Sequence, residues 1–198
     1  SRSSNATYVG GDGLIKTATT NLLLRSEEFD NASWVVKANI IVTADSSTTL
    51  APNGTATADF IAANTATGQH RIAQTIATTA QTYTLSVYAK AGGYDWVVLY
   101  ANAGNSGRHF NVQNGTIGQQ TGNANTPQIV PVGGGWYRCS IVYTATAASD
   151  LLIFNIANAD GAFSFTGDGT SGIYIWGAQL ETGCEATPYI KTTSTTNS

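Results

Sequence analysis

The sequence predicts an all-β protein, a two-sheet antiparallel β-sandwich with little or no helix. Short segments rich in β-branched and aromatic residues recur along the chain, and clusters of Gly, Asn, Asp and Ser separate them, as is typical of sandwiches. Within these segments apolar and polar residues alternate with the period of two that a strand imposes. No stretch shows helical periodicity, and the Ala- and Thr-rich stretches contain too many β-branched residues to be good helices.

The composition bounds the size and the surface of this sandwich. The chain has 198 residues, which fits one large β domain, and its 42% hydrophobic and 10% aromatic content can support a core. Only 11% of the residues are charged, so hydroxyl and amide groups are predicted to cover the surface. A net charge of -3 and an isoelectric point near 5.2 argue against nucleic-acid binding, and no apolar run is long enough for membrane insertion. The chain starts without a Met or a hydrophobic signal segment, so we expect a piece of a longer protein.

Residues 1–20 are predicted to form an extended lead-in or a small hairpin. Tyr8 and Val9 precede a Gly-Gly-Asp-Gly sequence that permits a turn, and Leu14 and Ile15 follow it. The sandwich is expected to span residues 21–190. Residues 191–198 are low in complexity and are expected to be a flexible tail.

Strands are predicted throughout residues 21–190, and the turn clusters set their limits. Asn114-Gly115 is the strongest hairpin signal, because a type I′ turn needs positive φ at both of its central positions. The predicted strands lie near residues 39–44, 56–62, 69–77, 82–90, 95–101, 107–113, 127–132, 136–146, 150–158 and 172–180.

The strand predicted at 172–180 has two distinct faces. Ile173 and Ile175 alternate with Tyr174 and Trp176, so the two pairs are expected to point in opposite directions. A strand that is aliphatic on one face and aromatic on the other suits the middle of a sandwich.

Alternation within the other strands predicts a surface that is both aromatic and polar. Sugars favour such a surface, because their C–H faces lie on aromatic rings while their hydroxyls bind amide and guanidinium groups. The alternative is that the Trp side chains fill a large core. The candidate ligand-binding residues are Trp96, Tyr100, Tyr88, Arg138, Trp176 and Lys90.

Groups suited to catalysis are scarce. His70 and His109 both lie in strand-like segments, and no Gly-x-Ser-x-Gly motif indicates a serine nucleophile. Cys139 and Cys184 are far apart and lack metal-ligand spacing, so they either pair with each other or remain free thiols. We therefore expect no enzymatic activity and no required cofactor.

Glu27, Glu28 and Asp30 form the one close acidic cluster. Glycoside cleavage needs two carboxylates that flank a sugar bond, but a solvated loop or a structural calcium site fits this cluster better, since calcium takes carboxylate and carbonyl oxygens. The Asp-Gly turns at 160–161 and 168–169 are further calcium candidates.

An ordered set of motifs resembles a recurring module of bacteriophage tail fibres and other virion surface proteins. The resemblance covers nearly the whole chain, and the set is more specific than any one of its parts. Its segments are Tyr8–Ala18, Asn21–Trp34, Ala51–Asp59, His70–Gln74, Ser86–Gly92, Gly135–Arg138 and Gly172–Glu181.

That module is similar in turn to jelly-roll carbohydrate-binding modules. The resemblance implies a jelly-roll sandwich on a phage virion that binds a polysaccharide or cell-surface glycan without cutting it, outside the cell and within a fibre that can be a homo-oligomer. A structural domain that packs between virion subunits is the alternative. Sugar-binding relatives often carry consecutive aspartates where Trp176 and Gly177 stand here, which weakens the calcium prediction.

Overall fold

The protein is a β-sandwich made of two six-stranded sheets. The computed structural model describes residues 7–9, 15–17 and 19–196, and these residues include strands, turns and loops but no helix. Every pairing between neighbouring strands of the two large sheets is antiparallel. The predicted jelly-roll sandwich is therefore confirmed, and with no helix present no described helix could cross a membrane.

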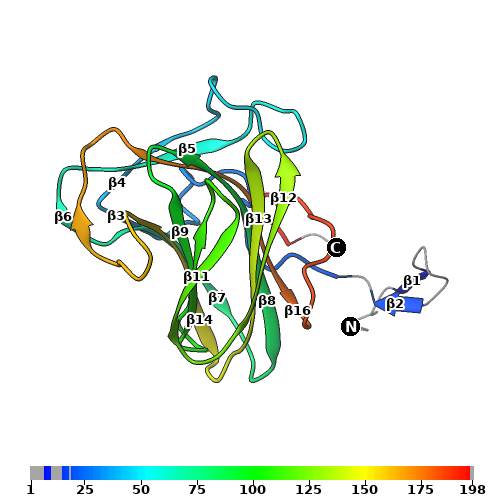
Figure 1. Ribbon diagram of the computed structural model, residues 1–198. Helices are drawn as coiled ribbons and strands as arrows, with labels where there is room; N and C mark the ends of the chain where they lie inside the picture. The colour runs from blue at the N-terminus through cyan, green and yellow to red at the C-terminus, as the bar shows by residue number, and fades with distance from the viewer. Residues whose placement is uncertain (1–6, 10–14, 18, 197–198) are drawn as a thin grey trace.

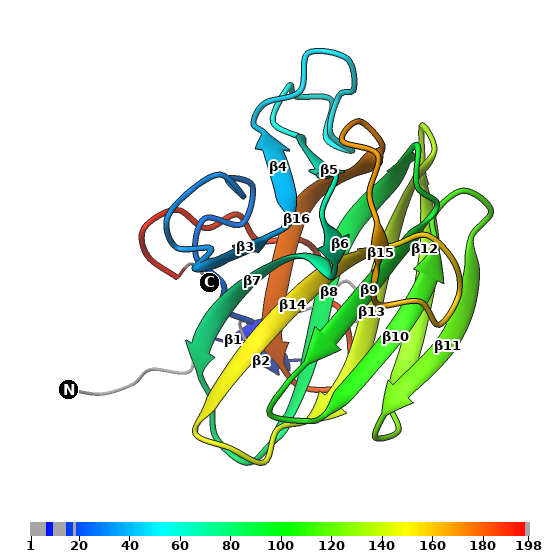
Figure 2. The ribbon, with the colours of Figure 1, turned by 90° about the vertical axis from the view of Figure 1, so that its left-hand side faces the viewer.

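One sheet, here called the β9 sheet, has the strand order β11-β10-β9-β14-β7-β3. Figure 2 looks onto this sheet and shows β7, β14, β9, β10 and β11 side by side. Its strands are β3 (Val36–Ala38), β7 (His70–Ala77), β9 (Trp96–Ala101), β10 (Ser106–Asn111), β11 (Thr116–Gly122) and β14 (Ser149–Ala157).

The other sheet, here called the β8 sheet, has the order β12-β13-β8-β16-β5-β4 and lies to the right of the first in Figure 1. Its strands are β4 (Ile40–Thr43), β5 (Asp59–Ala63), β8 (Thr82–Gly92), β12 (Thr126–Gly133), β13 (Trp136–Thr144) and β16 (Gly172–Thr182). Two small pairs complete the strands, β1 (Thr7–Val9) with β2 (Ile15–Thr17) and β6 (Thr67–Gly68) with β15 (Phe165–Thr166).

The core fills the space between the two sheets. The central strands contribute every second residue to it, as the alternation predicts. The inward residues of the two central strands are Val97, Leu99 and Ala101 from β9, and Tyr83, Leu85, Val87 and Ala89 from β8. The segment that precedes β3 adds Leu23, Phe29 and Trp34, with the Phe29 and Trp34 ring centroids 4.7 Å apart.

A bulge in β16 changes which residues face the core. Ile173 and Ile175 are core residues and Trp176 points to the outer side, as predicted. The pairing of β16 with β8 then shifts between Trp176 and Gln179, where Gly177 has a φ of 62°. The extra residue turns Ala178 into the core, whereas unbroken alternation would have placed it with Trp176.

All of the predicted strands are present in the structure. The strands that were not predicted are short or polar. β3, β6 and β15 have two or three residues each, and β11 is largely exposed, so none carries a clear alternation. The hairpin at Asn114-Gly115 forms, but the type I′ prediction is wrong. Asn111 pairs with Thr116 across a four-residue loop in which Gly115 alone has positive φ.

The two ends of the chain differ in how well they match the prediction. β1 and β2 form the predicted hairpin, and its Gly-Gly-Asp-Gly turn lies outside the described residues. The prediction of a free tail from residue 191 is wrong at its start. Thr192 is buried, its hydroxyl donates to the Leu23 carbonyl at 2.6 Å, and the Arg25 amide donates to the Thr193 carbonyl.

Candidate functional site

The six predicted ligand-binding residues do not form one surface. Trp96 and Tyr100 lie on the outer face of the β9 sheet, whereas the other four lie on the outer face of the β8 sheet. Strand alternation identified the outward face of each strand correctly. It could not show that β8 and β9, which follow each other in the chain, belong to opposite sheets.

On the β8 sheet, the Trp side chains are largely buried in a cluster on the outer side of the sheet. Trp176 is only 4% exposed, and its indole N–H donates to the Thr57 hydroxyl at 3.0 Å. The rings of Tyr88 and Tyr189 pack on it, with centroids at 5.2 and 4.5 Å. Trp136 belongs to the same small outer cluster, which is separate from the core between the two sheets. These indoles are therefore mostly buried, but they do not fill the sandwich core.

Arg138 and Lys90 flank this cluster. Arg138 donates to the Thr187 carbonyl at 2.6 Å and to the Ser86 hydroxyl at 3.1 Å, and its guanidinium lies 5.4 Å from the centre of the Tyr88 ring. Lys90 lines a hollow of about 420 Å³ together with Trp136. Arg138 thus ties down the C-terminal segment.

A groove of about 600 Å³ lies on the outer face of the β9 sheet. We call it the β9 groove. It is lined by Gln69, Arg71, Tyr100, Asn102, Thr121, Leu151, Ile153, Asn155 and Phe163.

The floor of the β9 groove follows from the register of the strands. Ile153 of β14 pairs with Tyr100 of β9, which pairs with Gly107 of β10. A Cβ at Gly107 would lie 2.5 Å from a ring carbon of Tyr100, so the ring lies over the space that this glycine leaves. The Tyr100 hydroxyl donates to Asn105 Oδ1 at 2.6 Å, and this bond fixes the ring as a half-buried platform.

One wall of the groove comes from the loop between β14 and β15. Phe163 packs edge-on against His109, with ring centroids 4.9 Å apart. The His109 Nε2 lies 3.4 Å from the Ala162 carbonyl, so His109 supports the loop. Trp96 is half-buried near Gly118 and Asp160 and does not line the groove.

Two polar groups in the groove lack partners. Asn155 and Arg71 are paired across β14 and β7 and therefore share the outer face. Asn155 is only 3% exposed, yet neither its Oδ1 nor the Arg71 Nε has a hydrogen-bond partner among the described residues. An unsatisfied buried polar atom costs about 1–3 kcal/mol, which a ligand can recover. The sequence analysis missed both residues, although alternation places Arg71 opposite the inward Ile72.

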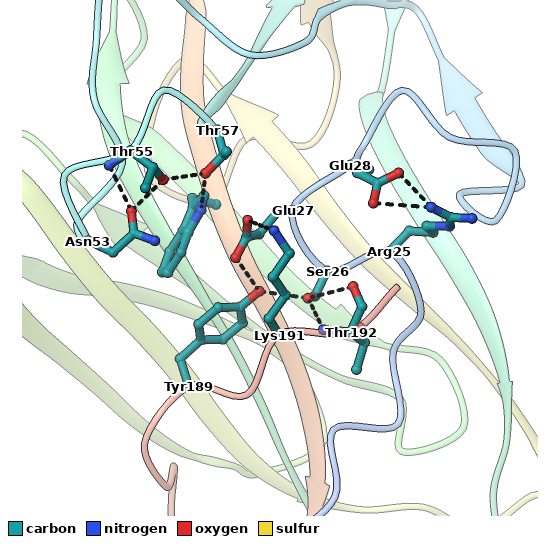
Figure 3. A network of polar contacts seen from close by, with 11 residues as sticks. Arg25, Ser26, Glu27, Glu28, Asn53, Thr55, Thr57, Tyr189, Lys191 and Thr192 are labelled. Atoms are coloured by element: carbon teal, nitrogen blue, oxygen red, sulfur yellow. Dashed lines mark hydrogen bonds and ion pairs between the residues drawn. The ribbon is translucent and has the colours of Figure 1, made fainter. Parts of the chain in front are cut away.

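Two carboxylates of the acidic loop are held by protein partners. Glu27 is buried, accepts from Lys191 at 2.8 Å and from the Tyr189 hydroxyl at 3.1 Å, and Glu28 pairs with Arg25 at 2.9 Å (Figure 3). In the described parts of the chain no three His, Cys, Asp or Glu side chains converge on a common metal position. Glu27 and Glu28 thus have separate protein partners, and calcium binding by Glu27, Glu28 and Asp30 stays a prediction.

The remaining candidates have structural partners. Hydrogen bonds from the Ser171 side chain and from the amides of Ser171 and Thr170 lower the pKa of the Asp168 carboxyl. Asp160 Oδ1 accepts from the Gln119 amide. Cys139 and Cys184 are both free, and burial raises the pKa of the Cys139 thiol. No Asp, Glu or His lines the β9 groove within the described residues.

The fold and this groove define a jelly-roll sandwich with an aromatic and polar surface site, and two solved structures resemble the chain distantly. A domain of the bacteriophage CBA120 tailspike protein 4, described as enzymatically active, is 16% identical with a TM-score of 0.43, covering 81% of this chain and 21% of that chain. The carbohydrate-binding module TmCBM61, in complex with β-1,4-galactotriose, is 10% identical with a TM-score of 0.43, covering 82% and 99%.

These two structures are of the two kinds that the resemblance indicated, a phage virion protein and a carbohydrate-binding module. The chain spans about a fifth of the tailspike chain. No protein-family model matches the sequence, and no curated protein matches it. The function is therefore argued from the groove itself.

Proposed function

We propose that this domain is a non-catalytic glycan-binding module that acts on the surface of a phage virion, outside the cell. The observation that carries the proposal is the β9 groove, in which an aromatic platform and unpartnered polar atoms lie together. Its volume of about 600 Å³ lies within the range of small-ligand sites.

The groove offers both kinds of contact that a sugar needs. The ring of Tyr100 can stack on the C–H face of a pyranose, and Phe163 adds apolar surface at the wall. The amides of Asn155, Gln69 and Asn102 can donate to hydroxyls and accept from them. A terminal amide has a broad, roughly two-fold torsion, so Asn155 can turn either its oxygen or its nitrogen toward a ligand.

The absence of a carboxylate pair among the described lining residues supports binding without cleavage. Glycosidases of the common types need two carboxyl groups, one on each side of the scissile bond. Glu27 and Glu28 are bound in ion pairs away from the groove. We expect no release of reducing ends from any polysaccharide that the domain binds.

A glycan array followed by affinity gels tests the proposal. The array should contain neutral polysaccharides, including β-1,4-galactan, and acidic ones. Retention in gels that contain the best polysaccharide, and loss of retention in Tyr100→Ala, would support the proposal. Failure to bind any glycan on the array would overturn it.

A second candidate function is a structural domain that packs between subunits of a fibre. Val130 and Val132 on the edge strand β12 are 49% and 41% exposed, and Leu50 nearby is 57% exposed. Exposed apolar residues at a sheet edge favour association with another chain. Light scattering after size exclusion tests this candidate, because a stable oligomer that Val130→Asp and Val132→Asp dissociate would support it.

A further inference from the structure

Arg71 is a cation in the β9 groove, and none of the described residues forms an ion pair with it. It projects from β7 and lines the groove, whereas Arg25, Arg108 and Arg138 all donate side-chain hydrogen bonds to protein acceptors. No side-chain hydrogen bond or ion pair joins Arg71 to another described residue, and its Nε is buried.

The surroundings of Arg71 also lack negative charge. Among the described residues that line the groove, it is the only charged one. The protein as a whole has a net charge of -3, so acidic residues outnumber basic ones. The lack of an acidic side chain in the lining of this groove therefore does not reflect a shortage of acidic residues in the chain. A partly buried charge is costly unless it is paired.

Asn155 provides the second, independent observation. This side chain is 3% exposed, lies directly across from Arg71 on the same face, and has an Oδ1 without a partner among the described residues. Arg71 and Asn155 together present donors and an amide that can rotate. The Tyr100 platform lies in the next row, paired with Ile153.

We propose that the β9 groove takes acidic saccharides, and that Arg71 pairs with the carboxylate of the bound sugar. The guanidinium is planar and presents its donors as a fork that matches a carboxylate. The sugar ring then lies on Tyr100, and an adjacent hydroxyl or the second carboxylate oxygen meets the Asn155 amide. This inference rests on the proposed function and specifies the class of glycan.

The test compares polysaccharides that differ in the carboxylate alone. Uronate-containing polysaccharides, such as polygalacturonate, hyaluronan and alginate, are each used beside their own carboxyl-reduced form, and a sulfated neutral polysaccharide is included. Affinity is measured for the native protein, Arg71→Gln and Arg71→Lys. Arg138→Gln on the opposite sheet is the control for loss of one positive charge.

We expect native protein to prefer at least one acidic polysaccharide over its reduced form by about tenfold or more. Arg71→Gln should lose that preference, and Arg71→Lys should retain part of it because the charge remains without the fork. Since Arg71 has no side-chain bond to lose, the melting temperature of Arg71→Gln should stay close to the native value. Arg138→Gln should keep the preference.

Several results would overturn the inference. Equal binding of acidic and reduced polysaccharides would refute it while leaving the proposed function in place, and binding to no glycan would refute both. If Arg71→Gln still prefers acidic polysaccharides over their reduced forms, the carboxylate must bind at a residue other than Arg71. A preference for the sulfated polysaccharide alone would refute the proposal that Arg71 pairs with a carboxylate.

Discussion

Replacing Tyr100 with Ala separates the two roles that the structure gives this ring. As a platform in the β9 groove, the ring should contribute much of the glycan affinity, and we expect Tyr100→Ala to weaken binding about tenfold or more, which corresponds to about 1.4 kcal/mol. Its hydroxyl bond to Asn105 at 2.6 Å nets roughly 0.5–1.5 kcal/mol of stability. The ring is only half-buried, so the total loss of stability should stay below the roughly 3–5 kcal/mol of a core aromatic.

Affinity gels and thermal melts of the same samples test both numbers. Tyr100→Phe keeps the platform and loses the hydroxyl bond, so it should lower stability while nearly preserving affinity. Tyr88→Ala is the matched control, because Tyr88 is also half-buried but lies on the outer face of the β8 sheet. A folded Tyr100→Ala with native affinity would refute the assignment of the site, and weaker binding by Tyr88→Ala would move the site to the β8 sheet.

Four further predictions follow from residues outside the groove or at its margin. Trp176→Ala should lower the free energy of unfolding by about 3–5 kcal/mol, because the indole is buried; a native melting temperature would contradict this. Trp96→Ala should weaken binding less than Tyr100→Ala does, because Trp96 does not line the groove. An equal loss of affinity in the gels would show that the bound glycan also contacts Trp96, beside β11. Burial raises the pKa of the Asp59 carboxyl from 3.8 to about 6. The folded protein therefore binds a proton at this carboxyl more tightly than the unfolded protein does. As a consequence, the contribution of Asp59 to the free energy of unfolding falls as the pH rises from 3.8 to about 6. Denaturant melts of native protein and Asp59→Asn should therefore diverge with pH between 3.8 and 6, and parallel curves would show that the pKa is not raised. Treatment with EDTA should change neither melting temperature nor affinity, since the Glu27 carboxylate is held by Lys191 and Tyr189; a lower melting temperature would indicate a metal site.

Local alternation was enough to predict the fold class and the inward face of the central strands. Val97 and Leu99 of β9, and Leu85 and Val87 of β8, lie in the core as their spacing indicates. A period of two fixes which residues share a face of one strand. It carries no information on which sheet the strand joins, because that depends on pairing between residues far apart in sequence.

The candidate site could be predicted only in part for the same reason. Tyr100 was found because an outward aromatic ring is visible in the sequence, but its neighbours in the groove come from β7 and β14, which pair with each other and not with consecutive strands. Asn155 was missed because a polar residue in a strand gives no local sign that its oxygen lacks a partner. The burial of Trp176 depends on Thr57 and Tyr189, which belong to distant segments.

The central claim is that a glycan binds in the β9 groove, and mapping of amide chemical shifts during a titration tests it most directly. Isotope-labelled protein is titrated with an oligosaccharide of the best polysaccharide on the array. The shifted amides should cluster at Arg71, Tyr100 and Asn155, and the amides of Tyr88 and Trp176 should stay unchanged. Shifts confined to the outer face of the β8 sheet would contradict it.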